Sequence, residues 1–304
     1  MRDLIIIGAG PAGLAASLYA TKKRLDYVVL AEDLGGKSNY SIDLPDTDPG
    51  EQIRASELVT VYKTRLQYLR NSHAITGVCG VRAGNGSFTV ETVKGSNEEA
   101  RAVIVATGTR IDRDPVPGEA EFLSRGLGYS SGSYSHLLRG KRVFIAGETD
   151  RALSSALEIS IHADSVTVAL LEGGSFSPPL LERVRSLDRV SLVDRATLTA
   201  FEGDEYARSV TIASSGSERK IEADGFFIEP EPIPNTEFLG DSPATDDRGY
   251  LPVNGANMTA VDGLFAAGDV TGSGFEQVLV ALGDGGKASL SVYRYLIEHG
   301  LTAG

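Results

Sequence analysis

Three glycines near the start of the chain and one acid further on carry the clearest chemistry in the sequence. Gly8, Gly10 and Gly13 form the spacing G-x-G-x-x-G, and Glu32 follows the third glycine by 32 − 13 = 19 residues. In nucleotide-binding α/β folds the first glycine permits a tight turn, the second lets a pyrophosphate approach the backbone, and the third lets a helix pack closely. A carboxylate about 20 residues further on binds a ribose hydroxyl. The pattern therefore predicts a dinucleotide site.

A strand, a helix and a second strand must position these residues. Leu4–Ile7 and Tyr27–Ala31 are apolar runs typical of buried strands, and a helix is expected from Leu14 to about Lys22. The start of that helix would offer free N–H groups and a partial positive charge to phosphates. The glycine-rich stretch 33–40 follows the second strand, and its position beside the turn predicts contact with the cofactor.

Composition limits the possible functions. The chain has 304 residues, of which 41% are hydrophobic, and a formal net charge of −12. Sustained acidity argues against binding to nucleic acid or to anionic membranes, which attract basic patches. No apolar run approaches the roughly 18 residues of a membrane span. Asp3 and the glycine pattern also argue against a targeting signal at the start, so we expect a cytoplasmic protein.

Cysteine and histidine usage excludes two further kinds of chemistry. Cys79 is the only cysteine, so the chain can form neither an internal disulphide nor a C-x-x-C motif. The four histidines are scattered along the sequence, and we expect no metal site.

The rest of the first half predicts further α/β elements. A helix is expected at Glu51–Leu69, a small antiparallel unit at Ala74–Val81 and Ser87–Thr92, and a buried strand at Ala102–Val105 that ends in Thr-Gly. Residues 112–117 contain two prolines and predict a linker.

A second βαβ pattern follows, 147 − 8 = 139 residues after the first. Its strands are expected at Arg142–Ala146 and Ser165–Leu170, around a helix at Ala152–His162. Later strands are expected at Val190–Val193, Ala196–Phe201, Ser209–Ala213 and Gly225–Ile228, the last returning toward the first unit.

The C-terminal third predicts a strand that ends in Gly268-Asp269 and a helix at about Glu276–His299. The strand would place the Asp269 carboxylate where open α/β sheets bind ligands. Main-chain N–H groups near Gln277 and Val278 could stabilise negative charge on a bound ring. A capping role is the alternative for Asp269.

With these motifs in this order, the sequence resembles the low-molecular-weight thioredoxin reductase family of flavoproteins. The resemblance is carried by Gly8–Gly13, Ala106–Gly108 and Ala266–Val270, and it covers nearly the whole chain. It implies an α/β fold of two Rossmann-like, three-layer ββα dinucleotide-binding domains, the second inserted in the first. The FAD-binding domain would comprise residues 1–113 and 235–304, and the NAD(P)-type domain residues 114–234.

The resemblance also implies FAD as cofactor and a homodimer. The pyrophosphate would lie at Gly8–Gly13, the adenosine ribose on Glu32, the ribityl chain on Asp269, and the flavin pyrimidine edge at Gln277 and Val278. The residues expected to bind FAD are Gly8, Gly10, Pro11, Ala12, Gly13, Glu32, Gly36, Lys37, Asn39, Ala106, Thr107, Gly108, Gly268, Asp269, Gln277 and Val278. No catalytic residue is assigned.

The chain departs from the family at its redox motif. The family's C-x-x-C aligns with Ser130-Ser131-Gly132-Ser133. Thiol–disulphide exchange needs a thiolate, which serine cannot supply. The composition therefore excludes disulphide reduction by a dithiol of this chain, and the segment Tyr129–Tyr134 would line the flavin face instead.

The second glycine pattern is altered too. It runs Gly147-Glu148-Thr149-Asp150-Arg151-Ala152, so Thr149 replaces the glycine that admits a pyrophosphate, and two acids add negative charge. Leu170–Gly174 brings no basic residue, and Glu172 would favour NAD over NADP. We expect NAD(P)H to bind weakly here, and a second flavin remains open.

The motifs and the departures from the family leave three candidate functions. The first is an FAD-containing oxidoreductase that exchanges electrons with a ferredoxin-like protein or a second flavin. The second is an NAD(P)H-dependent reductase similar to thioredoxin reductase-like ferredoxin–NADP reductases, acting on a redox protein or a small-molecule acceptor. The third is a redox-inactive, flavin-binding regulatory protein.

Overall fold

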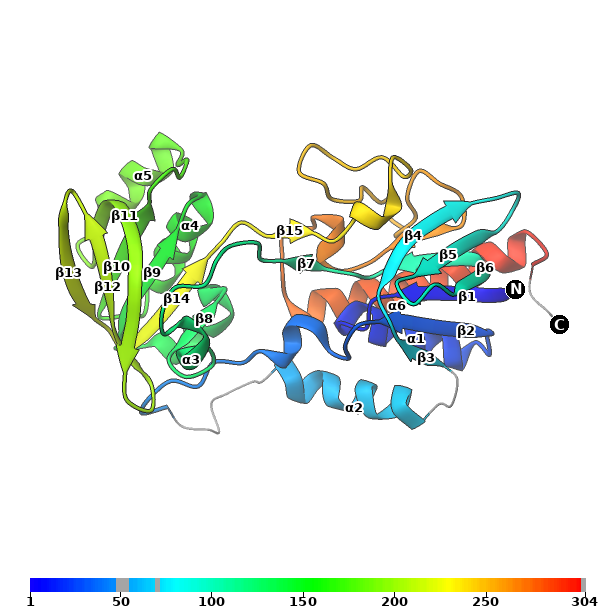
Figure 1. Cartoon of the computed structure of the whole chain (residues 1–304), viewed down its shortest axis with the longest axis horizontal. Coiled ribbons are helices and arrows are strands. Elements are labelled where there is room, and N and C mark those ends of the chain that lie inside the picture. The colour runs from blue at the N-terminus through cyan, green and yellow to red at the C-terminus, as the bar shows by residue number, and fades with distance from the viewer. Residues whose placement is uncertain (48–54, 69–71, 302–304) are drawn as a thin grey trace. The chain divides into compact units, whose positions relative to one another are not determined.

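The computed structural model describes residues 1–47, 55–68 and 72–301, and these form two compact units. The first unit comprises the described residues of Met1–Asn39, Arg54–Arg110 and Ile233–Gly304. The second comprises those of Tyr40–Ile53 and Ile111–Pro232. Figure 1 labels the elements of both units.

The first unit is built on a seven-stranded sheet in the order β3-β2-β1-β6-β5-β4, with β16 also paired to β6. Strands β3, β2, β1, β6 and β16 are parallel, and β5 and β4 add an antiparallel ribbon. The elements are β1 (Arg2–Ile7), α1 (Pro11–Lys22), β2 (Tyr27–Ala31), α2 (Ala55–Tyr68), β3 (His73–Ile75), β4 (Val78–Ala83), β5 (Phe88–Thr92), β6 (Asn97–Val105), β7 (Thr109–Arg110), β15 (Ile233–Pro234), β16 (Leu264–Ala266) and α6 (Val278–Glu298).

Strand β1 is apolar on both faces because both faces of the sheet are covered. Leu4 and Ile6 join the core that includes side chains of α1 and α6, whereas Ile5 and Ile7 join a second core with side chains of β5 and β6. All four side chains are buried. A continuous apolar run is typical of a central parallel strand. Here the run and the strand both end at Ile7, directly before Gly8.

The second unit carries its own seven-stranded sheet, in the order β13-β12-β11-β10-β9-β14-β8. Strands β11, β10, β9, β14 and β8 are parallel, and β12 and β13 are antiparallel. The elements are α3 (Glu119–Phe122), β8 (Leu127–Tyr129), a 3-10 helix (Ser131–Leu138), β9 (Arg142–Gly147), α4 (Asp150–Ile159), β10 (Ser165–Leu171), α5 (Pro178–Arg185), β11 (Val190–Gly203), β12 (Ala207–Ser214), β13 (Ser217–Glu222) and β14 (Gly225–Glu229).

Two mixed sheets with parallel central strands and covering helices confirm the expected α/β fold class. Helix α1 begins at Pro11 rather than Leu14, since proline suits the first helical position, where its missing N–H costs nothing. The strand expected at Ala74–Val81 is wrong: it is split at Thr76-Gly77 into β3, which pairs with β2, and β4, which pairs with β5.

One expectation in the second half of the chain differs, and part of another falls at a gap. The two strands expected between Val190 and Phe201 are one strand, β11, with irregular register. The strand at Gly225 pairs with β9 and β8 in the second unit, and the chain re-enters the first unit soon after it, at Ile233, as expected. Residues 51–54 and 69 of the expected helix at Glu51–Leu69 lie outside the described residues.

No helix in the described ranges combines the length and apolar character needed to cross a bilayer. The same residues contain no group of three or more His, Cys, Asp or Glu side chains placed to hold a metal ion.

Helix α6 lies against α1 (Figure 1), and Gly285 stands at the contact. A Cβ at Gly285 would overlap the Ala12 carbonyl oxygen, whereas a Cβ at Gly283 on the same helix would meet nothing within 4 Å. We expect Gly285→Ala to lower the free energy of unfolding by about 3 kcal/mol through overpacking. Gly283→Ala is the matched control and should raise it by about 0.5–1 kcal/mol through helix propensity. Chemical denaturation at one protein concentration measures both, and equal effects would contradict this packing.

Candidate functional site

The carboxyl ends of β1 and β6 define a crevice in the first unit. Strand β1 connects through α1 to β2 on one side, while β6 lies on its other side. Such a reversal of strand order is where open α/β sheets bind ligands. Gly8 follows β1 and Ala106 follows β6, so the two glycine-containing motifs of the sequence meet at this point.

The glycine turn combines tight packing with one open position. Gly8 has φ of +101°, and a Cβ there would overlap the Ala106 carbonyl oxygen. A Cβ at Gly13 would overlap the Gly8 carbonyl oxygen. Gly10 has an ordinary φ of −69° and a Cβ there would meet nothing within 4 Å. The fold therefore requires Gly8 and Gly13, whereas Gly10 leaves free space at the start of α1, where a pyrophosphate fits.

Pro11 and Ala12 form the first turn of α1. Ala12 lies beside Gly268 in the loop that precedes α6. A Cβ built at Gly268 would stand only 3.0 Å from the Ala12 Cβ. Gly268 has φ of +76°, which favours glycine, and it directs the chain into Asp269. The turn and the Gly-Asp motif are thus neighbours although Gly13 and Gly268 are 268 − 13 = 255 residues apart.

The glycine-rich loop lies against the same turn. The Gly35 amide donates to the Ala9 carbonyl at 2.7 Å, and a Cβ at Gly36 would lie 3.4 Å from Gly10 Cα. Asn39 donates to the Leu34 carbonyl at 3.1 Å and so closes the loop on itself. The structure therefore brings Gly36 to the open position at Gly10.

Glu32 follows β2 with an exposed side chain. Its Oε1 lies 2.6 Å from where a Cβ would stand at Gly77, so a larger residue there would displace the carboxylate from this position. Gly77 is a residue that sequence reasoning missed. Its signal was a glycine in the middle of the expected strand Ala74–Val81, where glycine often marks a close approach.

Thr107 and Gly108, at the end of β6, are fixed by Asn235. The Thr107 hydroxyl donates to the Asn235 carbonyl at 2.7 Å, and the Asn235 side chain donates to the Thr107 carbonyl at 3.0 Å. The Asn235 amide donates to the Gly108 carbonyl at 3.0 Å. Sequence reasoning missed Asn235 because no local pattern connects it with a motif 128 residues earlier.

Lys37 joins three segments of the crevice. Its Nζ lies 2.7 Å from Asp269 Oδ2 and 2.8 Å from Glu276 Oε2, and it donates to the Thr109 hydroxyl at 2.7 Å. Burial lowers the pKa of the Lys37 ammonium, but the charges of Asp269 and then Glu276 outweigh burial and raise it above the ordinary value. One positive charge between two carboxylates leaves a net negative charge beside the expected ribityl position.

Gln277 and Val278 stand at the start of α6. Gln277 has extended backbone, and its carbonyl accepts from the Ala281 amide at 3.0 Å. All sixteen residues expected to bind FAD thus lie in the first unit, in four segments that follow the carboxyl ends of its parallel strands and include the first turns of α1 and α6. The open position at Gly10 and the carboxylates of Glu32 and Asp269 fit a dinucleotide, and the assignment of these residues to FAD stays a prediction.

The serines that align with the redox motif lie in the second unit. Ser130 precedes the 3-10 helix Ser131–Leu138 with φ of +57°, and the Ser133 amide donates to its carbonyl at 3.0 Å. Cys79 is exposed on β4 of the first unit, and its Sγ lies 3.6 Å from the Glu91 carbonyl oxygen. The segment Ser130–Ser133 keeps a compact turn, but its sequence contains no thiol.

The second glycine pattern leads from β9 into α4. Thr149 caps the helix, accepting from the Arg151 amide at 3.4 Å, and donates to Glu231 at 3.2 Å. Asp150 accepts from the Ser177 amide at 2.8 Å, so the chain's own loop already engages this carboxylate. A threonine side chain thus stands at the position that corresponds to the open Gly10.

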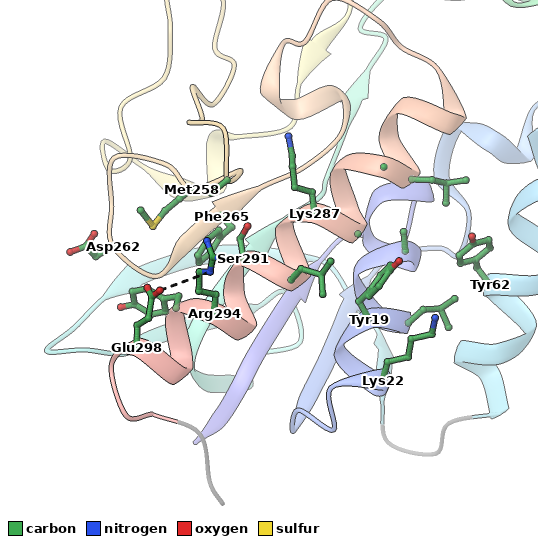
Figure 2. A pocket seen from close by; sticks show the side chains of 18 of the residues that line it. Tyr19, Lys22, Tyr62, Met258, Asp262, Phe265, Lys287, Ser291, Arg294 and Glu298 are labelled. Atoms are coloured by element: carbon green, nitrogen blue, oxygen red, sulfur yellow. Dashed lines mark ion pairs between the residues drawn. The ribbon is translucent and has the colours of Figure 1, made fainter.

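A groove of about 930 Å³ lies elsewhere on the first unit, over α1 and α6. Figure 2 shows Tyr19 and Lys22 of α1 on one side and Lys287, Arg294 and Glu298 of α6 on the other. Its lining contains none of the sixteen predicted residues. The groove is therefore distinct from the crevice at the glycine turn.

Comparison with known proteins gives a family match and two groups of relatives. A model of the family described as pyridine nucleotide-disulphide oxidoreductase matches residues 2–285. The F subunit of alkyl hydroperoxide reductase of Escherichia coli (strain K12) is 31% identical over 316 residues, and that of Xanthomonas campestris pv. phaseoli is 30% identical over 309 residues. Both alignments cover 97% of this chain but only 58% and 57% of those proteins. The chain thus spans less than two thirds of the length of the curated relatives it matches.

Solved structures resemble the chain over nearly its whole length. Thioredoxin reductase from Streptococcus pyogenes MGAS5005 gives a TM-score of 0.89 at 27% identity, covering 98% of this chain and 99% of that one. Thioredoxin reductase from Giardia duodenalis gives a TM-score of 0.86 at 25% identity, covering 97% and 99%. These likenesses agree with the fold class expected from the sequence.

Proposed function

We infer the function of this chain from its family, since the chain belongs to the pyridine nucleotide-disulphide oxidoreductases. It is a flavin oxidoreductase of the thioredoxin reductase-like type, and proteins of this type bind FAD. When bound, FAD carries the electrons, and the protein supplies binding, orientation and electrostatic tuning.

We propose that FAD binds in the first unit and that the chain works without a dithiol of its own. One observation carries this proposal. The turn at Gly10 is open, whereas the corresponding Thr149 in the second unit bears a side chain that is engaged with Glu231. The residues of the first unit hold the cofactor, and Lys37 joins the loops around it through Asp269 and Glu276. Mass spectrometry of the cofactors released from purified protein should find FAD, and its absence would overturn the assignment.

The electron donor is proposed to be a ferredoxin-like protein or a second flavin rather than NAD(P)H. Phosphates would meet Glu148 and Asp150 at the second turn, and a helix N-terminus offers only about half an elementary charge against them. Because the chain has a net charge of −12, a protein partner with a basic contact surface would be complementary to it. The NAD(P)H-dependent reductase is the alternative that a fast reaction with NADPH would establish.

The relatives named thioredoxin reductase lead to a direct test of the missing dithiol. We expect no reduction of insulin through thioredoxin, with NADPH as reductant, because a disulphide must be attacked by a thiolate and Ser130 and Ser133 have none. Turnover with several thioredoxins should stay at the rate of the reaction without this protein. Cys79→Ala should change nothing, as this exposed thiol has no second cysteine in the chain. Robust turnover in either protein would contradict the proposal.

We also propose that the groove over α1 and α6 is the contact surface of a homodimer. Leu279, 69% exposed, and Leu290, 41% exposed, offer apolar area there. Lys287, Arg294 and Glu298 line the same groove with charges of both signs (Figure 2), so a second copy related by a two-fold axis can pair unlike charges.

Light scattering should find the mass of two chains for the wild type. Leu290→Asp should shift the protein toward one chain, because it places a charge in the apolar contact. Val61→Asp is the control, since the Val61 side chain is also exposed to solvent, on α2, and does not line the groove. A monomeric wild type would rule out this surface.

A further inference from the structure

The carboxyl edge of the second sheet has its own reversal of strand order. Strand β9 connects through α4 to β10 on one side, and β14 lies on its other side (Figure 1). Dinucleotides bind at such a point. At this edge Glu229, the last residue of β14, pairs with Gly147, the first glycine of the altered pattern.

The two units allow a position-by-position comparison of this point. In the first unit the last strand pair is Ile7 with Val105, so Gly8 and Ala106 stand one step further on. In the second unit that step is Gly147 with Glu229. Glu229 therefore corresponds to Ala106, just as Thr149 corresponds to Gly10. A neutral methyl group in the first unit is replaced by a carboxylate in the second.

The Glu229 carboxylate is buried and surrounded by donors. The residue is 1% exposed. Its Oε1 accepts from the Ser131 amide at 2.7 Å, from the Ser131 hydroxyl at 2.6 Å and from the Ser155 hydroxyl of α4 at 2.9 Å. Its Oε2 lies 3.6 Å from Nε of Arg151, in the first turn of α4. Backbone N–H, hydroxyl and guanidinium groups of this kind are those that proteins use to bind a phosphate.

Arg151 is the basic residue of the altered turn, and it is engaged inside the unit. Besides Glu229 it reaches the Ser130 hydroxyl, to which Nη2 donates at 3.3 Å. The same set of contacts therefore ties the segment Ser130–Ser133 to the start of α4. A nucleotide phosphate at this edge would meet Glu229 and would have to compete with it for Arg151.

We propose that Glu229 is an internal anion that takes the place of a nucleotide phosphate in the second unit, and that it is the residue that excludes NAD(P)H there. This inference rests on the proposed function, in which NAD(P)H is not the donor. Glu229 acts as a specificity-determining residue: it holds Arg151 and Ser131 in the positions that a bound phosphate would otherwise claim. Thr149 acts with it by filling the space that Gly10 leaves open in the first unit.

The test is a gain of binding, which a merely structural role would not produce. Affinities of the FAD-loaded protein for NADPH and NADH are measured by calorimetry for the wild type, Glu229→Gln and Glu229→Ala. We expect at least one of the two nucleotides to bind at least tenfold more tightly to both variants. Glu229→Gln keeps the shape of the side chain and removes its charge, so it serves even where the smaller alanine weakens folding. The double variant Thr149→Gly with Glu229→Ala reproduces the first unit's residues at both positions. It should show the largest gain in affinity for the nucleotide.

Glu182→Gln is the matched control, because it removes one carboxylate from an exposed position on α5 of the same unit. It should leave both affinities unchanged. Weak binding by the wild type together with equally weak binding by folded Glu229→Gln would overturn this inference and leave the proposed function standing. Tight binding of NADPH by the wild type would overturn both.

Discussion

Gly10→Val is expected to give a folded protein that has lost its FAD. A Cβ at Gly10 would meet nothing within 4 Å, and the backbone there has φ of −69°, which any residue adopts. The chain itself therefore tolerates the larger side chain. The valine would instead occupy the space before α1 that we assign to the pyrophosphate, and a loss of about 3 kcal/mol would weaken binding roughly a hundredfold.

The visible spectrum after purification measures the effect, with circular dichroism as evidence of folding. Gly255→Val is the matched control, since Gly255 is exposed in a turn of the same unit and a Cβ there also meets nothing within 4 Å. That variant should stay yellow. A Gly10→Val protein that retained one FAD per chain would show that the pyrophosphate lies elsewhere.

Lys37→Met should weaken both the fold of the first unit and its binding of FAD. The side chains of Asp269 and Glu276 are 13% and 19% exposed, and both would lose the ammonium that lies within 2.8 Å of each carboxylate. Because the Lys37 side chain is itself 43% exposed, solvent screens part of the effect. We expect the free energy of unfolding to fall by about 2 kcal/mol and FAD to bind about tenfold more weakly.

The same variant gives a pH dependence with a defined sign. The folded pKa of Lys37 is raised above the ordinary 10.5 by the two carboxylates, against the opposing effect of burial. The stability that Lys37 contributes is therefore complete below pH 10.5 and is lost as the pH rises through the folded pKa. The difference in unfolding free energy between wild type and Lys37→Met should be constant near neutral pH and shrink above pH 10.5. Lys37→Arg keeps the charge, so its free energy of unfolding should lie closer to that of the wild type. A Lys37→Met protein as stable as the wild type would contradict this role of Lys37.

The parts of the fold that the sequence predicts are those set by local patterns. The apolar run before Gly8 and the spacing to Gly13 predict β1, the turn and α1 in this order, because strand burial and glycine geometry act over a few residues, but they do not predict the start of α1 at Pro11. The split of Ala74–Val81 into β3 and β4 was not predictable in this way. It depends on pairing with two different strands, β2 and β5, which the local alternation of side chains does not encode.

The candidate site follows the same division. Glycines and strand-end acids are recognisable by their spacing, and the structure places Gly10, Gly36 and Asp269 around one crevice. The polar contacts that hold this crevice together are not recognisable from sequence spacing. Lys37 contacts Glu276, which is 239 residues away, and Thr107 contacts Asn235, which is 128 residues away. The sequence suggested Lys37 through the position of the stretch 33–40 and through the family resemblance, and Glu229 not at all.

We propose that FAD in this protein receives electrons from a partner other than NAD(P)H. Anaerobic stopped-flow mixing of the FAD-loaded protein with NADPH, with NADH and with a reduced ferredoxin, followed by flavin absorbance, tests it most directly. We expect the reduced ferredoxin to bleach the flavin and neither nucleotide to do so at concentrations up to about 100 μM, within the range of ordinary Michaelis constants. Rapid bleaching by NADPH or NADH at such concentrations would contradict it and would establish the NAD(P)H-dependent reductase instead.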